Sequence, residues 1–353
     1  MRKNTFKCVY PQSWCEERRA LRDLAIMLFS LGVILMSAEA FTNGVEWLGK
    51  RLHLGVGAVG SVLAAVGTAL PETMVPVIAF LGTQGEDGIA EVGIGAILGA
   101  PFMLATLAFF VSGVAVLVFR RNNGPLFINT SVIRRDIKFF LLVYSFAILA
   151  SFLPTRPLKL GVAGLLPILY GIYVIKTVRN SQGAEDHGNL PTLYISRRNH
   201  SPSLNLILAQ LTLALLGIVA GAHMFVDAVQ SVALLTGIPA FILSLIITPI
   251  ATELPEKFNS VIWLRRGKDT LALGNITGAM VFQSSVIPAI GIALTPWQLD
   301  PLALWSALLA LGSGLLIYMT LRRRGTILPI NLIAGGGFYL LFILTLLRFP
   351  QFH

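Results

Sequence analysis

Long apolar stretches alternate with short polar segments along nearly the whole chain. Each apolar stretch approaches the ~20 residues that an α-helix needs to cross the hydrocarbon core of a bilayer. This pattern predicts an all-α polytopic membrane protein with about ten transmembrane helices. The expected helices cover residues 24–46, 57–82, 90–119, 137–153, 158–176, 205–230, 238–264, 271–294, 301–321 and 327–347.

The composition supports a membrane protein and sets a polar leader apart from the first apolar stretch. Of the 353 residues, 55% are hydrophobic and 12% are charged, against about 25% charged in soluble domains. Residues 1–22 are polar and hold both cysteines, Cys8 and Cys15. The first apolar stretch is longer than the core of a signal peptide, so we expect no cleaved signal. A disulfide between the two cysteines and a pair of free thiols both remain open.

The positive charges follow a pattern that indicates membrane topology. The net charge is +10, and 17 basic residues fall in the loops after expected helices one, three, five, seven and nine, whereas 9 lie on the other side. The positive-inside rule places those loops in the cytoplasm and both termini outside a cell (plasma or inner) membrane, although the basic leader favours the opposite orientation. The charges form no single basic face, so we expect the lipid bilayer and inorganic cations as partners, and no nucleic acid.

Two of the apolar stretches each contain a proline followed directly by a glutamate, Pro71-Glu72 and Pro255-Glu256. An ionisable group at membrane depth is costly, which makes each glutamate a candidate functional residue. Proline has no N–H and clashes with the carbonyl four residues earlier, so we expect both helices to break. Broken helices at membrane depth commonly line the ion sites of transporters. The carbonyls freed in this way belong to Gly67 and Ala251.

A threonine precedes each glutamate by four residues, Thr68 before Glu72 and Thr252 before Glu256. This spacing places hydroxyl and carboxylate on one helix face. Carboxylate, carbonyl and hydroxyl oxygens are the ligands of hard cations such as Ca²⁺. The sequence therefore predicts a cation site formed by Gly67, Thr68, Glu72, Ala251, Thr252 and Glu256.

The chain repeats itself at an offset of 184 residues, which aligns residues 37–43 with 221–227 and 68–72 with 252–256. The offset becomes 179 after a longer connector in the first copy. Because each copy holds five expected helices, the second copy must enter the membrane from the opposite side. We therefore expect two inverted five-helix repeats, at 23–176 and 204–353, joined by a flexible cytoplasmic connector at 177–203.

In these motifs the sequence resembles the calcium/cation antiporter superfamily, and the sodium/calcium exchangers most closely. That family carries two Gly-Thr-Ser-x-Pro-Glu motifs, each followed by Gly-Asn-x-x-Gly-Ser-Asn, in two inverted five-helix halves. Residues 67–72 fit the first motif, and 252–256 fit its partner. The resemblance spans nearly the whole chain and implies that Glu72 and Glu256 bind calcium together with the backbone carbonyls of Thr68 and Thr252.

The chain departs from the family pattern where the resemblance would place sodium ligands. Ala100 and Ala279 stand in place of two serines, and Leu104 replaces an acid or amide. The remaining candidates for binding the coupling ion are polar residues near the two motifs: Glu253, Asn275, Gln283, Glu39 and Asp227.

Two of the polar residues have alternative explanations that the sequence leaves open. Glu253 is four residues before Lys257, the favourable order for a helical ion pair, and such a pair would leave two acids for the cation. His223 takes the position that an acid, Glu39, occupies in the first repeat, and a packed histidine without an ionic role also fits.

Two facing carboxylates in a low-dielectric site require neutralisation, by one divalent cation or by two monovalent ions. The expected protein is therefore a secondary active antiporter, exchanging calcium or a similar divalent cation for sodium or protons by alternating access, and it needs no cofactor. An intramembrane enzyme using the paired glutamates as acid and base is one alternative, although the repeat makes both acids equivalent. A cation channel is another, although paired carboxylates would hold a divalent ion too tightly for rapid flow.

Overall fold

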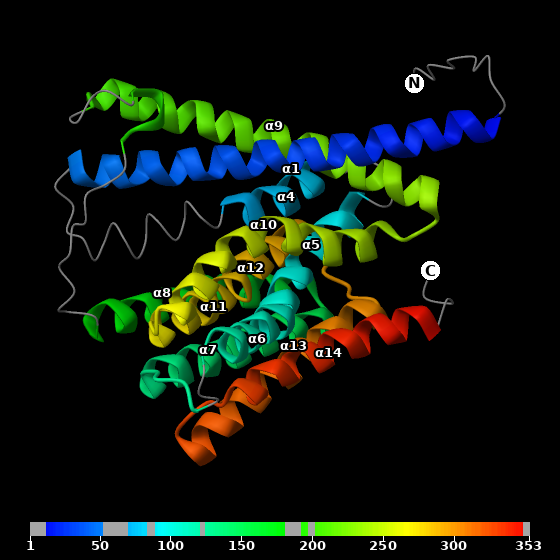
Figure 1. Ribbon diagram of the computed structural model, residues 1–353. Helices are drawn as coiled ribbons and strands as arrows, with labels where there is room; N and C mark the ends of the chain where they lie inside the picture. Colours follow the sequence, from blue (N-terminus) through cyan, green and yellow to red (C-terminus); the bar gives the residue numbers. More distant parts are fainter. Residues whose placement is uncertain are drawn as a thin grey trace.

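The computed structural model describes residues 12–51, 70–82, 89–120, 124–180, 192–196 and 202–348. Regular structure in these ranges is helical throughout (Figure 1). The α-helices are α1 (Gln12–Arg51), α4 (Leu70–Gly82), α5 (Ile89–Met103), α6 (Phe109–Phe119), α7 (Thr130–Leu149), α8 (Arg156–Asn180), α9 (Leu204–Thr236), α10 (Ala240–Arg265), α11 (Asp269–Gln283), α12 (Val286–Leu294), α13 (Pro301–Arg324) and α14 (Pro329–Arg348). Shorter elements are a π-helical turn, η2 (Leu104–Ala108), and two 3₁₀ turns, η3 (Ala150–Phe152) and η4 (Tyr194–Ser196).

The ends of several helices are specified by local sequence. The Asn129 side chain accepts hydrogen bonds from the first backbone N–H groups of α7, and Asp300 does the same for α13, which begins with Pro301. Such caps satisfy donors that have no partner within the helix. Gly237 ends α9 and Gly325 ends α13 with φ values of 71° and 67°, a left-handed conformation in which a side chain would be strained.

The prediction of an all-α membrane protein with about ten spans is confirmed. Each of the ten expected stretches overlaps a described helix, or a pair of them in the third span (α5 and α6) and the eighth (α11 and α12), and the second stretch is described only over α4. Large apolar side chains cover the outer faces, for example Leu234, 80% exposed, as expected for contact with lipid. Within the described ranges, seven segments are long and apolar enough to cross a membrane: Leu21–Val45, Ala90–Phe119, Arg156–Thr177, Leu204–Thr236, Asp269–Leu294, Pro301–Arg324 and Pro329–Arg348.

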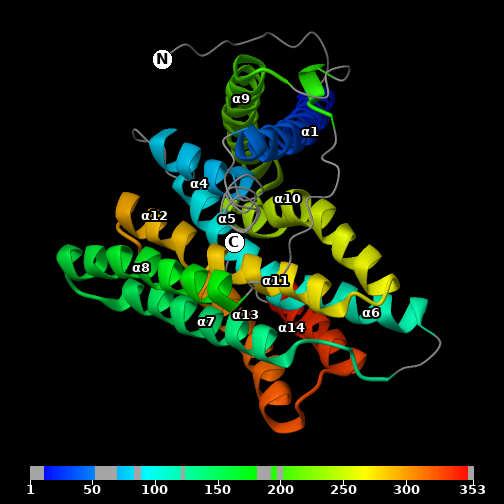
Figure 2. The ribbon, with the colours of Figure 1, turned by 90° about the vertical axis from the view of Figure 1, so that its left-hand side faces the viewer.

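The first helices of the two repeats, α1 and α9, lie side by side and run antiparallel, in a layer on one side of the other helices (Figures 1 and 2). Their backbones approach closely through glycines. A Cβ atom on Gly221 would lie 2.8 Å from Ile34, and one on Gly44 would lie 2.9 Å from Leu211. Small residues allow this close helix packing within membranes. The opposite directions of α1 and α9 are those of an inverted repeat.

Part of the expected connector packs against this two-helix layer. Leu193 is fully buried, Ile195 N–H donates to Gln210 Oε1 at 3.0 Å, and Gln210 Nε2 in turn donates to Asn43 Oδ1 at 2.9 Å. Residues 192–196 are therefore held against α1 and α9, contrary to the flexibility expected for the whole connector.

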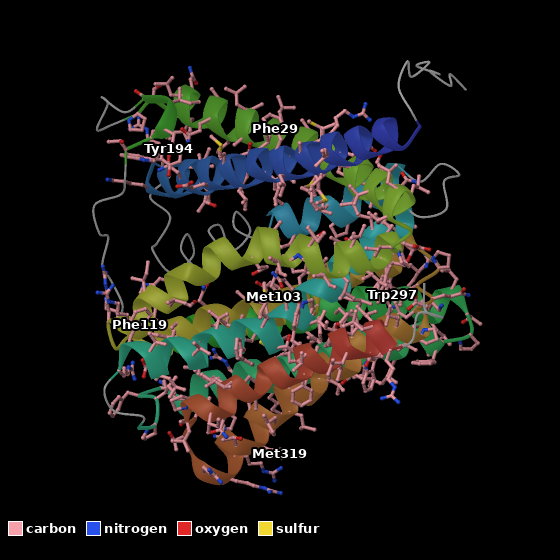
Figure 3. All side chains as sticks on the ribbon, turned by 45° about the vertical axis from the view of Figure 1, so that its right-hand side comes forward. Phe29, Met103, Phe119, Tyr194, Trp297 and Met319 are labelled. Carbon is pink, nitrogen blue, oxygen red and sulfur yellow. The ribbon has the colours of Figure 1, made fainter. Side chains whose placement is uncertain are left out.

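The remaining helices form the main bundle around a buried core that includes Phe102, Phe140 and Met280. Figure 3 shows Met103 in the middle of this bundle, with Phe119 and Trp297 at opposite ends. The C-terminal ends of α1, α6, α8, α10 and α13 lie toward the end that contains Phe119, on the left in Figure 1. We call it the basic end, because it carries Lys50, Arg120, Lys176, Arg265 and Arg322.

A buried ion pair holds the main bundle together at the basic end. Arg120, which follows α6, pairs with Asp269 at the start of α11 and also donates to the Leu264 carbonyl of α10 at 3.1 Å. The Asp269 side chain is fully buried and accepts a further hydrogen bond from Phe127 N–H at 2.8 Å. One arginine thereby links the ends of three helices.

Candidate cation site

Glu72 lies in the first turn of α4, and its side chain is buried, with 4% of its surface exposed. Pro71 precedes it as the second residue of the helix, where the missing N–H costs no helical hydrogen bond. An acidic group in a first helical turn is also favoured by the helix dipole. Gly67 and Thr68, predicted to share this site, lie outside the described residues.

The second motif lies within α10, where Thr252 and Glu253 are both buried, each 1% exposed. The expected break at Pro255 is not observed, because α10 continues without interruption to Arg265. The prediction of a broken helix is therefore wrong here. Pro255 nevertheless has no N–H to donate to the Ala251 carbonyl. The backbone of Ala251 and Glu256 belongs to α10, but their side chains, like that of Lys257, lie outside the described part of the chain.

A row of hydroxyl groups leads along α10 toward this motif. Ser244 Oγ lies 3.2 Å from Thr248 Oγ1, and Thr252 Oγ1 donates to the Thr248 carbonyl at 3.0 Å. All three side chains are buried. Ser244 and Thr248 are not among the predicted site residues, although Ser244, Thr248, Thr252 and Glu256 follow one another at intervals of four in the sequence. The row gives α10 a polar face inside an apolar bundle.

Two of the predicted coupling-ion candidates contact each other directly. Gln283, the last residue of α11, donates a hydrogen bond from Nε2 to Glu253 Oε1 on α10, and both side chains are buried. A third candidate, Asn275, is partly buried on α11 and donates to Ser260 Oγ at 3.2 Å. The amides of α11 thus face the polar groups of α10 at two levels.

The helix is irregular at the same place in both repeats. The repeat aligns Gln283 with Leu104. After Gln283 a turn at Ser284 and Ser285 separates α11 from α12, and at Leu104 the π-helical turn η2 begins. Irregular backbone at membrane depth is typical of functional positions. The second repeat places an amide there and the first places an apolar side chain, so the two halves are not chemically equivalent.

The other two coupling-ion candidates lie on the two-helix layer. Glu39 on α1 is exposed and accepts a hydrogen bond from the Tyr194 hydroxyl at 2.7 Å. Asp227 on α9 is also exposed. His223, on the same helix, has its Nδ1 atom 2.9 Å from the Val219 carbonyl oxygen. Neither acid is buried in the way that Glu72 and Glu253 are.

The two motifs are brought into one region by the packing of their helices. Both α4 and α10 pack on α5 and contact each other, and their side chains share an apolar cluster that includes Val75, Ile78 and Leu243. Among the described side chains no group of three acids, histidines or cysteines gathers at one point. The described geometry therefore supplies buried carboxylates from α4 and α10, with hydroxyl and amide groups beside them.

Sequence comparison identifies curated relatives of similar length. Inner membrane protein YrbG of Escherichia coli (strain K12) is 25% identical over 281 residues, which cover 79% of this chain and 82% of the relative. Putative antiporter CaxA of Alkalimonas amylolytica is 24% identical over 318 residues, covering 90% of this chain and 95% of the relative.

Solved structures share the fold. The H⁺/Ca²⁺ exchanger CAX superposes with a TM-score of 0.70 at 18% identity, covering 95% of this chain and 87% of that one. The sodium-calcium exchanger NCX_Mj superposes with a TM-score of 0.56 at 20% identity, covering 92% and 98%. The expectation of two inverted five-helix repeats is confirmed by these similarities in fold.

A family model described as sodium/calcium exchanger protein matches residues 23–178 and 206–349. These two stretches cover most of the chain and include the buried carboxylates of α4 and α10. The resemblance inferred from the two Pro-Glu motifs is thereby confirmed. The chain belongs to the sodium/calcium exchanger family of membrane proteins.

Proposed function

We propose that this protein is a secondary active antiporter that exchanges Ca²⁺, or a similar divalent cation, for protons or sodium ions by alternating access. The observation that carries the proposal is the burial of carboxylates on equivalent helices of the two repeats, Glu72 on α4 and Glu253 on α10. Glu256 lies about one turn beyond Glu253 on the same helix. One divalent cation offsets two such charges at once.

The cation would be held by oxygen atoms from both repeats. The proposed ligands are the carboxylates of Glu72 and Glu256 and the backbone carbonyls around the two prolines, those of Gly67, Thr68, Ala251 and Thr252. The Ala251 carbonyl is the best supported of these carbonyls, because Pro255 supplies no N–H to it. The Thr252 hydroxyl donates its hydrogen to the Thr248 carbonyl, so the lone pairs of Oγ1 can accept a hydrogen bond or coordinate a cation.

Obligatory exchange follows from the cost of burying charge. Two or three carboxylates that carry their negative charge are costly to move through a low-dielectric barrier, so the carrier without bound cations is trapped facing one side. A carrier neutralised by Ca²⁺ or by protons can change its facing. The motion would take place between the α1–α9 pair and the main bundle. Each of these parts contains helices of both repeats, so this differs from a simple rocking of one repeat against the other.

The missing polar groups favour protons as the counter-ion. Sodium needs several oxygen ligands, whereas Ala100, Ala279 and Leu104 provide no side-chain oxygen. A proton needs only a carboxylate, and Glu253 is a buried one beside an amide that can bond to either of its protonation states. Asn275 and Gln283 remain as ligands for a weak sodium site.

An intramembrane enzyme and a channel are less well supported. Membership of an exchanger family argues against an enzyme. Paired carboxylates that bind a divalent ion tightly argue against rapid flow through a channel. For orientation we retain the proposal that both termini lie outside the cell membrane, with the basic end in the cytoplasm.

Uptake of ⁴⁵Ca²⁺ into proteoliposomes of the purified protein tests the proposal. In sodium-free buffer, an imposed pH gradient alone should drive Ca²⁺ accumulation above that of protein-free liposomes. Accumulation only under a sodium gradient would contradict proton coupling. Downhill Ca²⁺ flux with no counter-ion on the opposite side would contradict antiport itself.

A further inference from the structure

A hollow of about 560 Å³ opens at the basic end between α7, α8 and α13, away from the cation site. It contains no acidic side chain among its lining residues, and five basic ones. The basic residues come from both repeats: Arg134, Arg135 and Lys138 of α7, Lys176 of α8 and Arg322 of α13.

Only one of these five charges is neutralised by a protein carboxylate within the described part of the chain. Arg135 pairs with Asp136 at 3.0 Å and lies over the Tyr173 ring. Arg134, Lys138 and Arg322 are exposed and pair with no described acid. Like charges gathered in one hollow repel each other, and an anion bound among them would remove that repulsion.

The wall of the hollow is apolar on the side that continues into the membrane. Phe139, Leu142 and Tyr318 form this wall. Leu142 follows Lys138 by one helical turn toward the centre of α7 and is 45% exposed, on a surface where lipid chains lie. Lys176 Nζ is 5.8 Å from the centre of the Phe139 ring, so a cation stands at the border between the charged and the apolar part. The hollow therefore has a basic part and an apolar part, as the headgroup and the acyl chains of a lipid require.

We propose that this hollow binds an anionic phospholipid of the leaflet at the basic end. The phosphate lies among Arg134, Lys138 and Arg322, where arginine donates paired hydrogen bonds to phosphate oxygens. One acyl chain lies along Phe139 and Leu142. Basic pockets between transmembrane helices bind acidic headgroups for these reasons. A free phosphate ion shares the headgroup chemistry but leaves the apolar wall uncovered.

The lipid would link the two halves of the protein. Helices α7 and α8 come from the first repeat and α13 from the second, and α7 also contacts α11 through a hydrogen bond from Thr277 Oγ1 to Asp136 Oδ2 at 3.0 Å. A headgroup between α7 and α13 therefore stiffens the main bundle near the helix that carries Gln283. This site is independent of antiport, and its test measures binding rather than transport.

Native mass spectrometry of the detergent-purified protein tests the proposal, with dioleoylphosphatidylglycerol as the probe and dioleoylphosphatidylcholine for comparison. The pocket variant combines Arg134→Gln, Lys138→Gln and Arg322→Gln. The control variant removes the same charge at the same end outside the hollow, with Arg266→Gln, Arg323→Gln and Arg324→Gln. Three single pocket variants serve in case the triple variant does not fold.

We expect phosphatidylglycerol to bind the wild type and the control variant, and the pocket variant to bind roughly 100-fold more weakly. Each basic residue near an acidic lipid contributes about 1 kcal/mol, so each single variant should lose roughly fivefold. Equal losses in both triple variants, or equal binding of phosphatidylcholine, would overturn the proposal.

Two further binding experiments distinguish the lipid from inorganic phosphate and from the acidic connector of the chain itself. Inorganic phosphate at the same concentration should not displace phosphatidylglycerol; displacement at equal concentration would make this a site for free anions. The variant Glu185→Gln with Asp186→Asn removes the acids of the connector, which lie outside the described residues. If only this variant bound the lipid, the connector itself would occupy the hollow and the proposal would be wrong.

Discussion

Gln283 on α11 donates a hydrogen bond to the carboxylate of Glu253 on α10, in a place where neither side chain has more than 2% of its surface exposed. A buried amide and carboxylate form a directional link between two helices. The link also joins the Pro-Glu motif of the second repeat to the point where its next span is irregular. A change in the charge of Glu253 would therefore alter a hydrogen bond that joins α10 to α11.

Replacing Glu253 should change the pH dependence of transport. Glu253→Gln keeps the shape and a hydrogen-bonding group but removes the proton that the carboxylate can bind. We expect its Ca²⁺ uptake to depend much less on pH than that of the wild type, measured in proteoliposomes over a series of buffers of different pH. Glu91→Gln, a change of an exposed acid at the start of α5, is the control and should keep the wild-type profile.

An unchanged pH profile in Glu253→Gln, with only a small loss of stability, would favour the alternative in which Glu253 serves as a partner of Lys257. The order of the two residues permits a helical ion pair worth about 0.2–0.5 kcal/mol. That outcome would leave Glu72 and Glu256 as the acids of the cation site.

Each repeat contains a Gly-x-x-x-Gly motif, Gly95–Gly99 on α5 and Gly274–Gly278 on α11, and glycines at equivalent positions should respond differently to alanine. A Cβ atom on Gly99 would overlap the Leu245 carbonyl of α10, and one on Gly95 would lie 2.5 Å from the Phe241 carbonyl oxygen. Around Gly274, in the second repeat, no atom of the described side chains lies within 4 Å of the same position. Gly95→Ala should cost about 1–3 kcal/mol through overpacking, whereas Gly274→Ala, at the equivalent position of the second repeat, should be neutral or slightly stabilising.

Thermal unfolding of both variants in one detergent checks this difference. Gly274→Ala is the matched control, because it makes the same chemical change at the position equivalent to Gly95 in the other repeat. Equal melting temperatures for the two variants would show that the close contact between α5 and α10 does not contribute to stability.

The sequence predicted the spans and the repeat correctly, because membrane-length apolar runs and a constant offset are local patterns. It did not distinguish Gly95 from Gly274, since the repeat makes these two positions equivalent and only the groups packed against them differ. The sequence also did not indicate Ser244 and Thr248 as site residues, because serine and threonine are common at helix contacts in membranes. Their role becomes visible only in the structure, where they form one row with Thr252. The contact of Glu253 with Gln283 joins residues 30 apart, and no periodicity reports such a pair.

Breaking the buried ion pair at the basic end should destabilise the protein far more than breaking an exposed one. Arg120→Gln leaves the fully buried Asp269 without its cation, which costs about 3–5 kcal/mol for buried pairs. Arg22 is 65% exposed and pairs with Asp23 within α1 at 2.8 Å. Arg22→Gln should therefore cost at most about 1 kcal/mol.

The melting temperatures of these two arginine variants, measured under identical conditions, provide the check. Similar small shifts for both would mean that Arg120 does not hold α6, α10 and α11 together.

The central claim is that the two motif glutamates jointly bind the divalent cation, and exchange of ⁴⁵Ca²⁺ by Glu72→Gln and Glu256→Gln tests it most directly. Both variants keep the side-chain size and should insert and fold as the wild type does, which size-exclusion chromatography verifies. We predict that each substitution alone abolishes Ca²⁺ exchange in proteoliposomes, while Glu91→Gln exchanges at the wild-type rate. Robust Ca²⁺ exchange by either of the two glutamine variants would contradict the assignment of the site.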